Sequence, residues 1–312
     1  MKVFYNGSTG SLGQYFEASL TKLGIEGRTL HSRLENSGTL ALELGSTPAV
    51  VPGELLFLIH MAALVSVKAC EEDPSKAFQT NVTHTIETVG TFVRWARQLN
   101  TTPVVVYVST GHVYKAPSER KPVTEDDPVA PRSVYARTKL EAEKRLQELA
   151  EQLGFLLLIG RVFGLVAPRQ PSHYVLPGLI RRVRTKALAG IPGLDYFRDY
   201  LDSRDVCDTL ALLCATVATL KAVPFSVLNI CSGKGVSIRH MVEEIIRAMR
   251  PHGHQKMLSS MSAGPGRPDD VPWLVGSSER FKTLTGKNPH TIGLAETIRD
   301  TLSEGAQKSP QN

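Results

Sequence analysis

Short apolar runs alternate with longer segments of helical periodicity through the first half of the chain. The runs predict strands at 2–6, 27–31, 55–60, 104–109 and 155–163, and the segments between them predict helices at 11–23, 74–99 and 132–153. Apolar strands that alternate with helices are typical of a parallel sheet that is covered by helices on both faces. Because crossovers between parallel strands are right-handed, the pattern predicts an α/β fold with a doubly wound parallel sheet.

The second half has a different pattern, in which proline and glycine interrupt residues 164–200. Beyond this stretch the pattern predicts a helix at 202–220, a strand at 225–230, a helix at 237–250, a loop at 251–272 and a disordered tail at 304–312. We interpret the basic cluster at 179–186 as a solvated helix face rather than a phosphate site. The pattern as a whole predicts a second, smaller C-terminal α/β unit.

Composition and charge disfavour several classes of protein. The chain has 312 residues, a formal net charge of +6 and no apolar run of the roughly 18 residues that a membrane helix needs. Its basic residues form neither a tail nor a stripe with aromatics, so we expect no nucleic-acid and no membrane partner. The cysteines at 70, 207, 214 and 231 show no close pairing, which predicts neither a disulfide framework nor a metal site. The sequence near residue 1 lacks a signal-peptide core, and we expect a cytoplasmic protein.

A glycine-rich loop, NGSTGSLG at 6–13, lies between the first strand and the first helix. Glycines at this point allow a tight turn and a close approach of the backbone to a pyrophosphate, which binds at the helix N-terminus. The alternative is a glycine-rich turn that Ser11 caps. The position favours a dinucleotide site of the Rossmann type, with these loop residues as cofactor ligands: Gly7, Thr9, Gly10, Ser11, Leu12 and Gly13.

The end of the second strand indicates which dinucleotide binds. NAD-binding proteins usually have an acidic residue here that holds the 2′-hydroxyl of the adenosine ribose. In this chain His31, Ser32 and Arg33 occupy the region, and no carboxylate is present there. A hydroxyl and a guanidinium suit a 2′-phosphate, so the sequence favours NADP(H) and leaves NAD(H) as the second choice. An exposed basic loop without a ligand is the alternative interpretation.

The stretch SVYARTKLEAEK at 133–144 places Tyr135 and Lys139 on one face of a predicted helix. Taken alone, the pair also fits a solvated tyrosine beside a solvated lysine. Ser109 and Thr110 end the strand at 104–109, at the sheet edge where ligands bind. A hydroxyl, a phenol and an ammonium near a nicotinamide form an acid–base set, because the ammonium and the oxidised ring both lower the pKa of the phenol. We therefore predict Thr110, Tyr135 and Lys139 as catalytic residues, the last two also in contact with the cofactor.

The glycine spacing and this catalytic set resemble the extended short-chain dehydrogenase/reductase family that acts on nucleotide sugars. Similar segments also lie at 60–82, 197–206, 228–238 and 266–289. The resemblance implies that Ala62 and Ala63 line the cofactor, and that Arg198 and Arg267 clamp the diphosphate of a nucleotide-diphosphate sugar. Surface ion pairs with Asp199 or Asp269 are the alternative for the two arginines. The full set that we expect to bind substrate is Ser109, Thr110, His112, Arg198 and Arg267.

Departures from the family pattern narrow the range of reactions that we expect. The 4,6-dehydratases carry a carboxylate just after the catalytic threonine, where this chain has Gly111 and His112, so a dehydratase is disfavoured. Residues 34–54 leave little room for a full helix, as in 4-keto-6-deoxyhexose reductases, and the GDP-4-keto-6-deoxymannose reductases are the most similar group. Gly164, however, replaces an asparagine that contacts substrate in many relatives.

We therefore favour NADPH-dependent reduction of the 4-keto group of a nucleotide-linked 4-keto-6-deoxy sugar. A nucleotide-sugar 4-epimerase that retains NAD(P) is one alternative, and a non-catalytic regulatory subunit of the same fold is another. The expected domains are 1–163 with 201–231 for the dinucleotide, and 164–200 with 232–303 for the substrate. Because relatives commonly pair through the helices at 74–99 and 132–153, we expect a homodimer.

Overall fold

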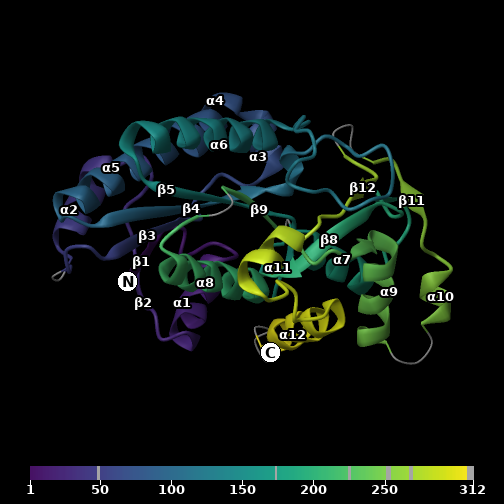
Figure 1. The fold of residues 1–312 in the computed structure, drawn as a ribbon. Coiled ribbons are helices and arrows are strands. Elements are labelled where there is room, and N and C mark those ends of the chain that lie inside the picture. The colour runs from purple at the N-terminus through teal and green to yellow at the C-terminus, as the bar shows by residue number, and fades with distance from the viewer. Residues whose placement is uncertain (48–49, 173, 224–225, 251–253, 267–269, 308–312) are drawn as a thin grey trace.

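A parallel sheet forms the centre of the protein (Figure 1). In this computed structural model the described residues are 1–47, 50–172, 174–223, 226–250, 254–266 and 270–307. Within them the main sheet has six parallel strands in the order β2-β1-β3-β4-β5-β9. Their bounds are β1 Lys2–Tyr5, β2 Glu26–Thr29, β3 Leu55–His60, β4 Thr102–Thr110, β5 Leu156–Val162 and β9 Val227–Ile230. The prediction of an α/β fold with a doubly wound parallel sheet is confirmed.

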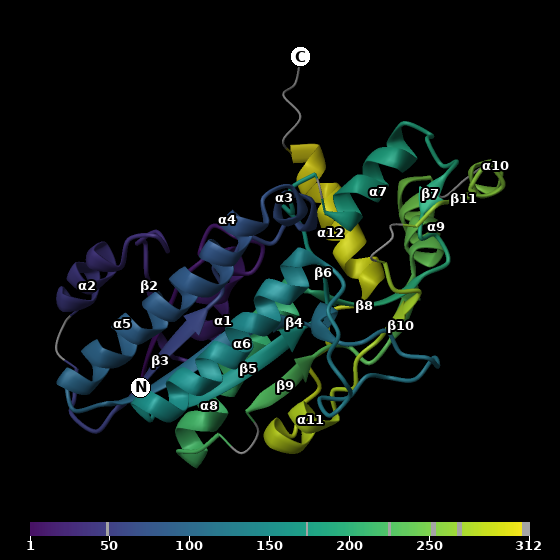
Figure 2. The same cartoon turned by 90° about the horizontal axis from the view of Figure 1, so that it is seen from above.

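Helices cover both faces of this sheet, as Figures 1 and 2 show. On one face lie α1 (Gly13–Lys22) and α8 (Ser203–Leu220), and on the other lie α3 (Val67–Glu72), α4 (Pro74–Phe78), α5 (His84–Gln98) and α6 (Val134–Leu153). Alternate side chains of β4 enter the two cores, since Val104 and Val106 pack with α8 whereas Val105 and Tyr107 pack with α5 and α6. Burial on both faces explains the nearly continuous apolar runs of the strands.

A π-helical turn at Gln79–Thr83 interrupts the helix predicted at 74–99. The turn contains the buried Asn81, whose side chain accepts a hydrogen bond from the Leu64 amide at 2.7 Å and donates to the Leu64 carbonyl and to Thr138 of α6. Asn81 thus ties the segment after β3 to α6. Because a π turn inserts one residue without changing the polarity of its neighbours, the hydrophobic period does not predict it.

Residues 34–54 contain a helix, α2 (Ser37–Gly45), so the expectation that they leave little room for one is wrong. Asn36 caps the helix with a side-chain hydrogen bond of 2.9 Å to a backbone amide. Leu40 and Leu44 are buried in the core on the α5 side of the sheet. Nine residues are enough for the helix because this one pair of leucines, a turn apart, fixes it to the core.

A second lobe lies beside the carboxyl ends of the main strands (Figure 2). The remaining elements are β6 Gly164–Val166, α7 Val175–Arg184, β7 Ile191–Pro192, β8 Phe197–Asp202, β10 Gly235–Ser237, α9 Ile238–Met249, α10 Gln255–Leu258, β11 Ala263–Gly264, β12 Trp273–Leu274, α11 Glu279–Thr285 and α12 Leu294–Gln307. Strand β8 pairs with β6, β10 and β12, while α7, α9 and α12 share a separate apolar core. Although α8, β9 and α11 pack with the first lobe, the exact domain boundaries stay a prediction.

Two predictions for the second half are wrong in part. The loop predicted at 251–272 contains α10 and β11. The tail predicted to be disordered from 304 begins inside α12, where Glu304 pairs with Arg169 at 2.7 Å, and 308–312 lie outside the described residues. No helix among the described residues is both long and apolar enough to cross a membrane.

A buried ion pair joins α6 to the two central strands. The carboxylate of Glu143 on α6 accepts hydrogen bonds from the Arg161 guanidinium of β5, the shortest at 2.7 Å, and from the Ser109 hydroxyl of β4. Ser109 and Arg161 are register partners, and none of the three residues is more than 7% exposed. One carboxylate therefore fixes the helix against the ends of both strands.

Substitution Glu143→Gln should lower the free energy of unfolding by about 3–5 kcal/mol, because the Arg161 guanidinium would stay buried without its counter-ion. Glu141→Gln removes an exposed pair with Arg145 on the same helix and should cost less than about 1 kcal/mol. Urea unfolding of the two variants and the wild type measures both losses. Equal losses would show that the buried pair stabilises the fold no more than the exposed one.

Candidate active site

The carboxyl ends of β1, β3 and β4 and the first turns of α1 and α6 surround a cavity of about 310 Å³. It brings together segments that are far apart in the sequence, as the resemblance implies for a cofactor site. The predicted residues that line it are Gly7, Thr9, Gly10, Ser11, Leu12, Gly13, Ala62, Ala63, Ser109, Thr110, Tyr135 and Lys139. His31, Ser32 and Arg33 line a neighbouring cavity, while His112 and Arg198 line a third.

Close backbone contacts explain the glycines of the loop after β1. Gly7 has φ +73°, and a Cβ there would lie 2.9 Å from the Ala62 amide nitrogen, while a Cβ on Gly13 would lie 2.2 Å from the Gly7 carbonyl oxygen. Leu12 at the N-cap of α1 provides no side-chain cap, and the Gln14 and Tyr15 amides of the first turn donate to the Gly10 and Leu12 carbonyls at 3.4 and 2.9 Å. The loop therefore fits a dinucleotide pyrophosphate.

Asn6 holds the two walls of this cavity together and was missed by the sequence analysis. Its side-chain carbonyl accepts hydrogen bonds from the Met61 and Ala62 amides at 2.9 and 3.0 Å, and its amide pairs with the buried His60 ring at 2.9 Å. A polar residue at a strand end, directly before the first glycine, was the available signal. Through Asn6, the ends of β1 and β3 keep Ala62 beside the glycine-rich loop.

Tyr135 and Lys139 extend from the first turns of α6 toward this cavity. Ser133 caps the helix by accepting a hydrogen bond from the Ala136 amide at 3.2 Å, which places Tyr135 in the first turn. Burial raises the pKa of Tyr135 above its ordinary value, and a hydrogen bond with the Thr110 side chain opposes that rise. The Tyr135 phenol is therefore protonated at neutral pH and is hydrogen-bonded with the predicted Thr110.

The Lys139 ammonium is enclosed and has a titratable neighbour. The residue is 3% exposed, and Nζ lies 4.1 Å from the centre of the Tyr107 ring. Burial lowers the pKa of Lys139 to about 7, while the negative charge of Glu143 acts in the opposite direction. Tyr135, Lys139 and Glu143 are spaced four residues apart, so they follow one face of α6.

Two predicted residues have partners that the sequence did not suggest. The Ser109 hydroxyl lines the cavity but donates its proton to Glu143, so in this arrangement it holds α6 rather than a ligand. Arg198 pairs with Asp270 at 2.8 Å and not with Asp199, which accepts hydrogen bonds from Ser232 and nearby backbone amides. Arg267 lies outside the described residues.

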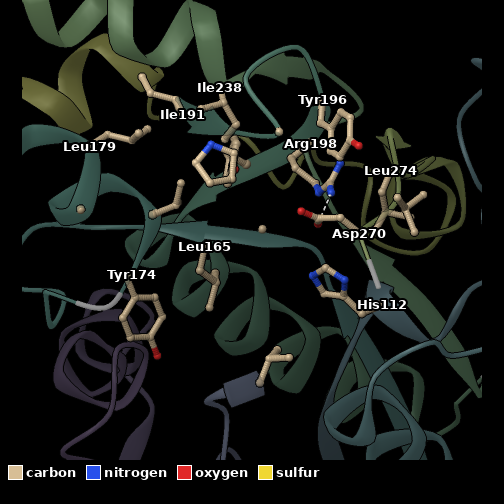
Figure 3. A pocket seen from close by; sticks show the side chains of 18 of the residues that line it. His112, Leu165, Tyr174, Leu179, Ile191, Tyr196, Arg198, Ile238, Asp270 and Leu274 are labelled. Carbon is tan, nitrogen blue, oxygen red and sulfur yellow. Dashed lines mark hydrogen bonds and ion pairs between the residues drawn. The ribbon is translucent and has the colours of Figure 1, made fainter. Parts of the chain in front are cut away.

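A second cavity of about 520 Å³ adjoins the first, and the two share Leu165 and Tyr174 as lining residues (Figure 3). His112 and the Arg198–Asp270 pair lie on one side of it, with Tyr196 next to Arg198. Its other polar lining residues include three arginines that we did not predict: Arg132, Arg181 and Arg182. The basic cluster at 179–186 is thus not only a solvated helix face, because two of its arginines border this cavity.

The loop after β2 differs from the prediction in one decisive respect. We expected no carboxylate near His31 and Ser32, but α2 brings the carboxylate of Glu43 there. It accepts hydrogen bonds from the His31 amide at 2.8 Å, the Ser32 amide at 3.0 Å and the Ser32 hydroxyl at 2.5 Å. The position of Glu43 could not be anticipated from the sequence, because the helix that carries it was not predicted. These contacts do not favour NADP(H) over NAD(H), and the cofactor preference stays a prediction.

Across the described parts of the chain, no group of three or more histidine, cysteine, aspartate or glutamate side chains is arranged to hold a metal ion. The four cysteines are buried and unpaired.

Residues 6–231 match the NAD dependent epimerase/dehydratase family, and the chain belongs to this family. The GDP-6-deoxy-D-mannose reductase of Pseudomonas aeruginosa is 29% identical over 256 residues, which cover 79% of each chain. The UDP-glucose 4-epimerase of Azospirillum brasilense is 26% identical over 340 aligned positions, covering 97% of this chain and 91% of the relative. The structure of RMD from Pseudomonas aeruginosa complexed with NADPH is similar with a TM-score of 0.78 at 22% identity, over 99% of this chain and 100% of that one. The resemblance to the extended short-chain dehydrogenase/reductases is confirmed.

Substitution Gly7→Ala should destabilise the fold more than Gly24→Ala. Both glycines have a positive φ, +73° and +65°, which costs an alanine about 1–2 kcal/mol. Only at Gly7 would the new Cβ also meet backbone atoms, since nothing lies within 4 Å at Gly24. Urea unfolding of the two variants should show a larger loss for Gly7→Ala. Equal losses would mean that the loop after β1 moves without cost.

The buried Lys139 should make stability depend on pH. Its pKa is about 7 in the fold and about 10.4 in an unfolded chain. Between these values the unfolded state binds more protons, so stability rises with pH. Relative to Lys139→Met, the wild type should gain up to about 1.4 kcal/mol of unfolding free energy per pH unit. Urea unfolding of both cofactor-free proteins at pH 7.5 and 9.5 measures this gain, and a difference that does not change with pH would contradict it.

Proposed function

We propose that this chain transfers a hydride at C4 of a nucleotide-diphosphate-linked sugar, and that it reduces the 4-keto group of a 4-keto-6-deoxy sugar. The observation that carries the proposal is the placement of Tyr135. Its hydroxyl bonds to Thr110, beside the enclosed Lys139, in a cavity that shares a wall with an arginine-lined one. The first cavity suits a nicotinamide cofactor and the second suits a diphosphate sugar.

Three residues would perform the proton chemistry. The bound nicotinamide would supply the hydride. Thr110 would hold the carbonyl oxygen of the sugar by a hydrogen bond, and Tyr135 would donate its proton to that oxygen as negative charge develops. Lys139 would stabilise the resulting phenolate, because an ammonium in a buried site acts strongly on a neighbouring charge.

Charge complementarity supports a nucleotide-diphosphate sugar as the partner. Arg132, Arg181 and Arg182 line the second cavity together with Arg198, and guanidinium groups match the geometry of a diphosphate. Asp270 neutralises Arg198 at 2.8 Å, so a bound diphosphate would compete with this pair. A homodimer through α5 and α6, common in relatives, is part of the proposal and remains to be measured.

The relatives and the site favour a reductase over a dehydratase. Of the two relatives described above, the reductase of Pseudomonas aeruginosa has the higher sequence identity to this chain. In addition, Gly111 and His112 occupy the positions where dehydratases carry a carboxylate. A nucleotide-sugar 4-epimerase with retained cofactor is the second candidate. The UDP-glucose 4-epimerase relative supports it, as does Glu43, whose carboxylate suits an NAD ribose.

Incubation of the purified protein with NADH or NADPH and with GDP- or dTDP-linked 4-keto-6-deoxy sugars separates these candidates. A reductase should oxidise the reduced cofactor in stoichiometric amounts with the sugar. An epimerase should show no net oxidation, but it should carry bound cofactor and interconvert 4-epimers of an unmodified nucleotide sugar. Neither activity would leave the non-catalytic regulatory subunit as the remaining interpretation.

Substitution Tyr135→Phe should lower turnover at least about 100-fold, because it removes the proton donor. Cofactor affinity should change little, since the ring stays in place. The matched control is Tyr15→Phe, which removes a hydroxyl that donates to the Pro168 carbonyl at 2.7 Å, away from Tyr135. Turnover and cofactor affinity are measured for both variants. Full activity in Tyr135→Phe would contradict the assignment of Tyr135 as the proton donor.

A further inference from the structure

The loop after β2 lies against the loop after β1. The two strands pair in parallel, and the Leu30 amide donates to the Tyr5 carbonyl at 2.7 Å, so the chain leaves both strands side by side. In a doubly wound sheet this edge receives the adenosine ribose of a bound dinucleotide. A cavity of about 640 Å³ opens here, and residues of α2 form its second wall.

Glu43 occupies the hydrogen-bond donors that this loop presents. Its carboxylate accepts from the amides of His31 and Ser32 and from the Ser32 hydroxyl, at 2.5 to 3.0 Å. Burial alone would raise the pKa of Glu43, but these hydrogen bonds outweigh it and hold the pKa below its usual value. The carboxylate of Glu43 on α2 therefore places a negative charge against the loop, where a 2′-phosphate would need its donors.

The nearby cations do not cancel this charge. Arg28 uses its guanidinium to hold α2, donating to the Glu43 backbone carbonyl at 3.2 Å and to Ser46 at 3.0 Å. The side chain of Arg33 is 86% exposed and lies 3.9 Å from the carboxylate of Glu35. An exposed guanidinium in water interacts only weakly with a charge several ångströms away.

The position of Glu43 is fixed by the packing of its helix. Leu44, the next residue, is fully buried, and Asn36 caps the first turn of α2. A carboxylate on such an element is rigid enough to accept two ribose hydroxyls, and a phosphate would have to displace it. Repulsion between two anions and the loss of three hydrogen bonds would both oppose that displacement.

We propose that Glu43 is the specificity-determining residue for the cofactor: it accepts the ribose 2′-hydroxyl of NAD(H) and excludes the 2′-phosphate of NADP(H). The carboxylate thus comes from α2, although the expected position is the end of β2. The inference rests on one part of the proposed function, namely that the protein binds a nicotinamide dinucleotide. It opposes the preference for NADP(H) that His31, Ser32 and Arg33 suggest from the sequence.

Titration of the cofactor-free protein with NADH and with NADPH, followed by nicotinamide fluorescence, tests the inference without any sugar. The wild type should bind NADH at least about tenfold more tightly than NADPH. Glu43→Gln keeps the size of the side chain and removes its charge. The dissociation constant for NADPH divided by that for NADH should therefore fall at least about tenfold in this variant. Glu35→Gln, which changes a loop residue that lines the same cavity, should change that ratio by less than about twofold.

A wild type that prefers NADPH, or an unchanged ratio in Glu43→Gln, would overturn the inference and leave the proposed hydride transfer intact. Failure to bind either cofactor would overturn both proposals. If Glu43→Gln does not fold, the cofactor preference of the wild type still tests the inference. Acid release of any dinucleotide that copurifies with it should then yield NAD, and release of NADP would refute the role of Glu43.

Discussion

The carboxylate of Glu143 holds α6 against the ends of β4 and β5, and the geometry of the candidate active site depends on this contact. Arg161 and Ser109 donate to it from neighbouring strands, and all three side chains are buried. A buried charge pair tolerates little displacement, because separation would leave both ions without solvent. Tyr135 and Lys139 lie on the same face of α6, so their distance from Thr110 is set by the same contact.

Burial also gives the site its electrostatic character. Lys139 lies over the Tyr107 ring and has lost most of its solvent, which lowers its pKa to about 7, while Glu143 opposes that shift. The same enclosure makes ionisation of Tyr135 unfavourable until opposite charge is near. The charge that Lys139 can carry therefore depends on its burial and on Glu143, and the protonation of Tyr135 depends on desolvation and on its hydrogen bond with Thr110.

Charge is distributed unevenly between two of the cavities. Arginines line the cavity proposed for the diphosphate sugar, whereas the cavity beside the second strand contains the carboxylate of Glu43. The formal net charge of +6 gives no indication of this local difference. Discrimination between two dinucleotides that differ by one phosphate depends on such a local charge, because interactions at longer range are screened.

The central strands, the long helices that cover them, the glycine-rich loop and the Tyr135–Lys139 pair were predictable from the sequence, because each depends on spacing within one element or between adjacent elements. Other features required the tertiary structure. The hydrogen bonds of Glu43 with Ser32 and of Ser109 with Glu143 join separate elements. The arginines of α7 likewise line the same cavity as Arg198 of β8. Local periodicity cannot predict them, since they depend on how helices pack across the sheet. The sequence alone thus determined the fold class and the candidate catalytic set, and only packing decided which charges surround them.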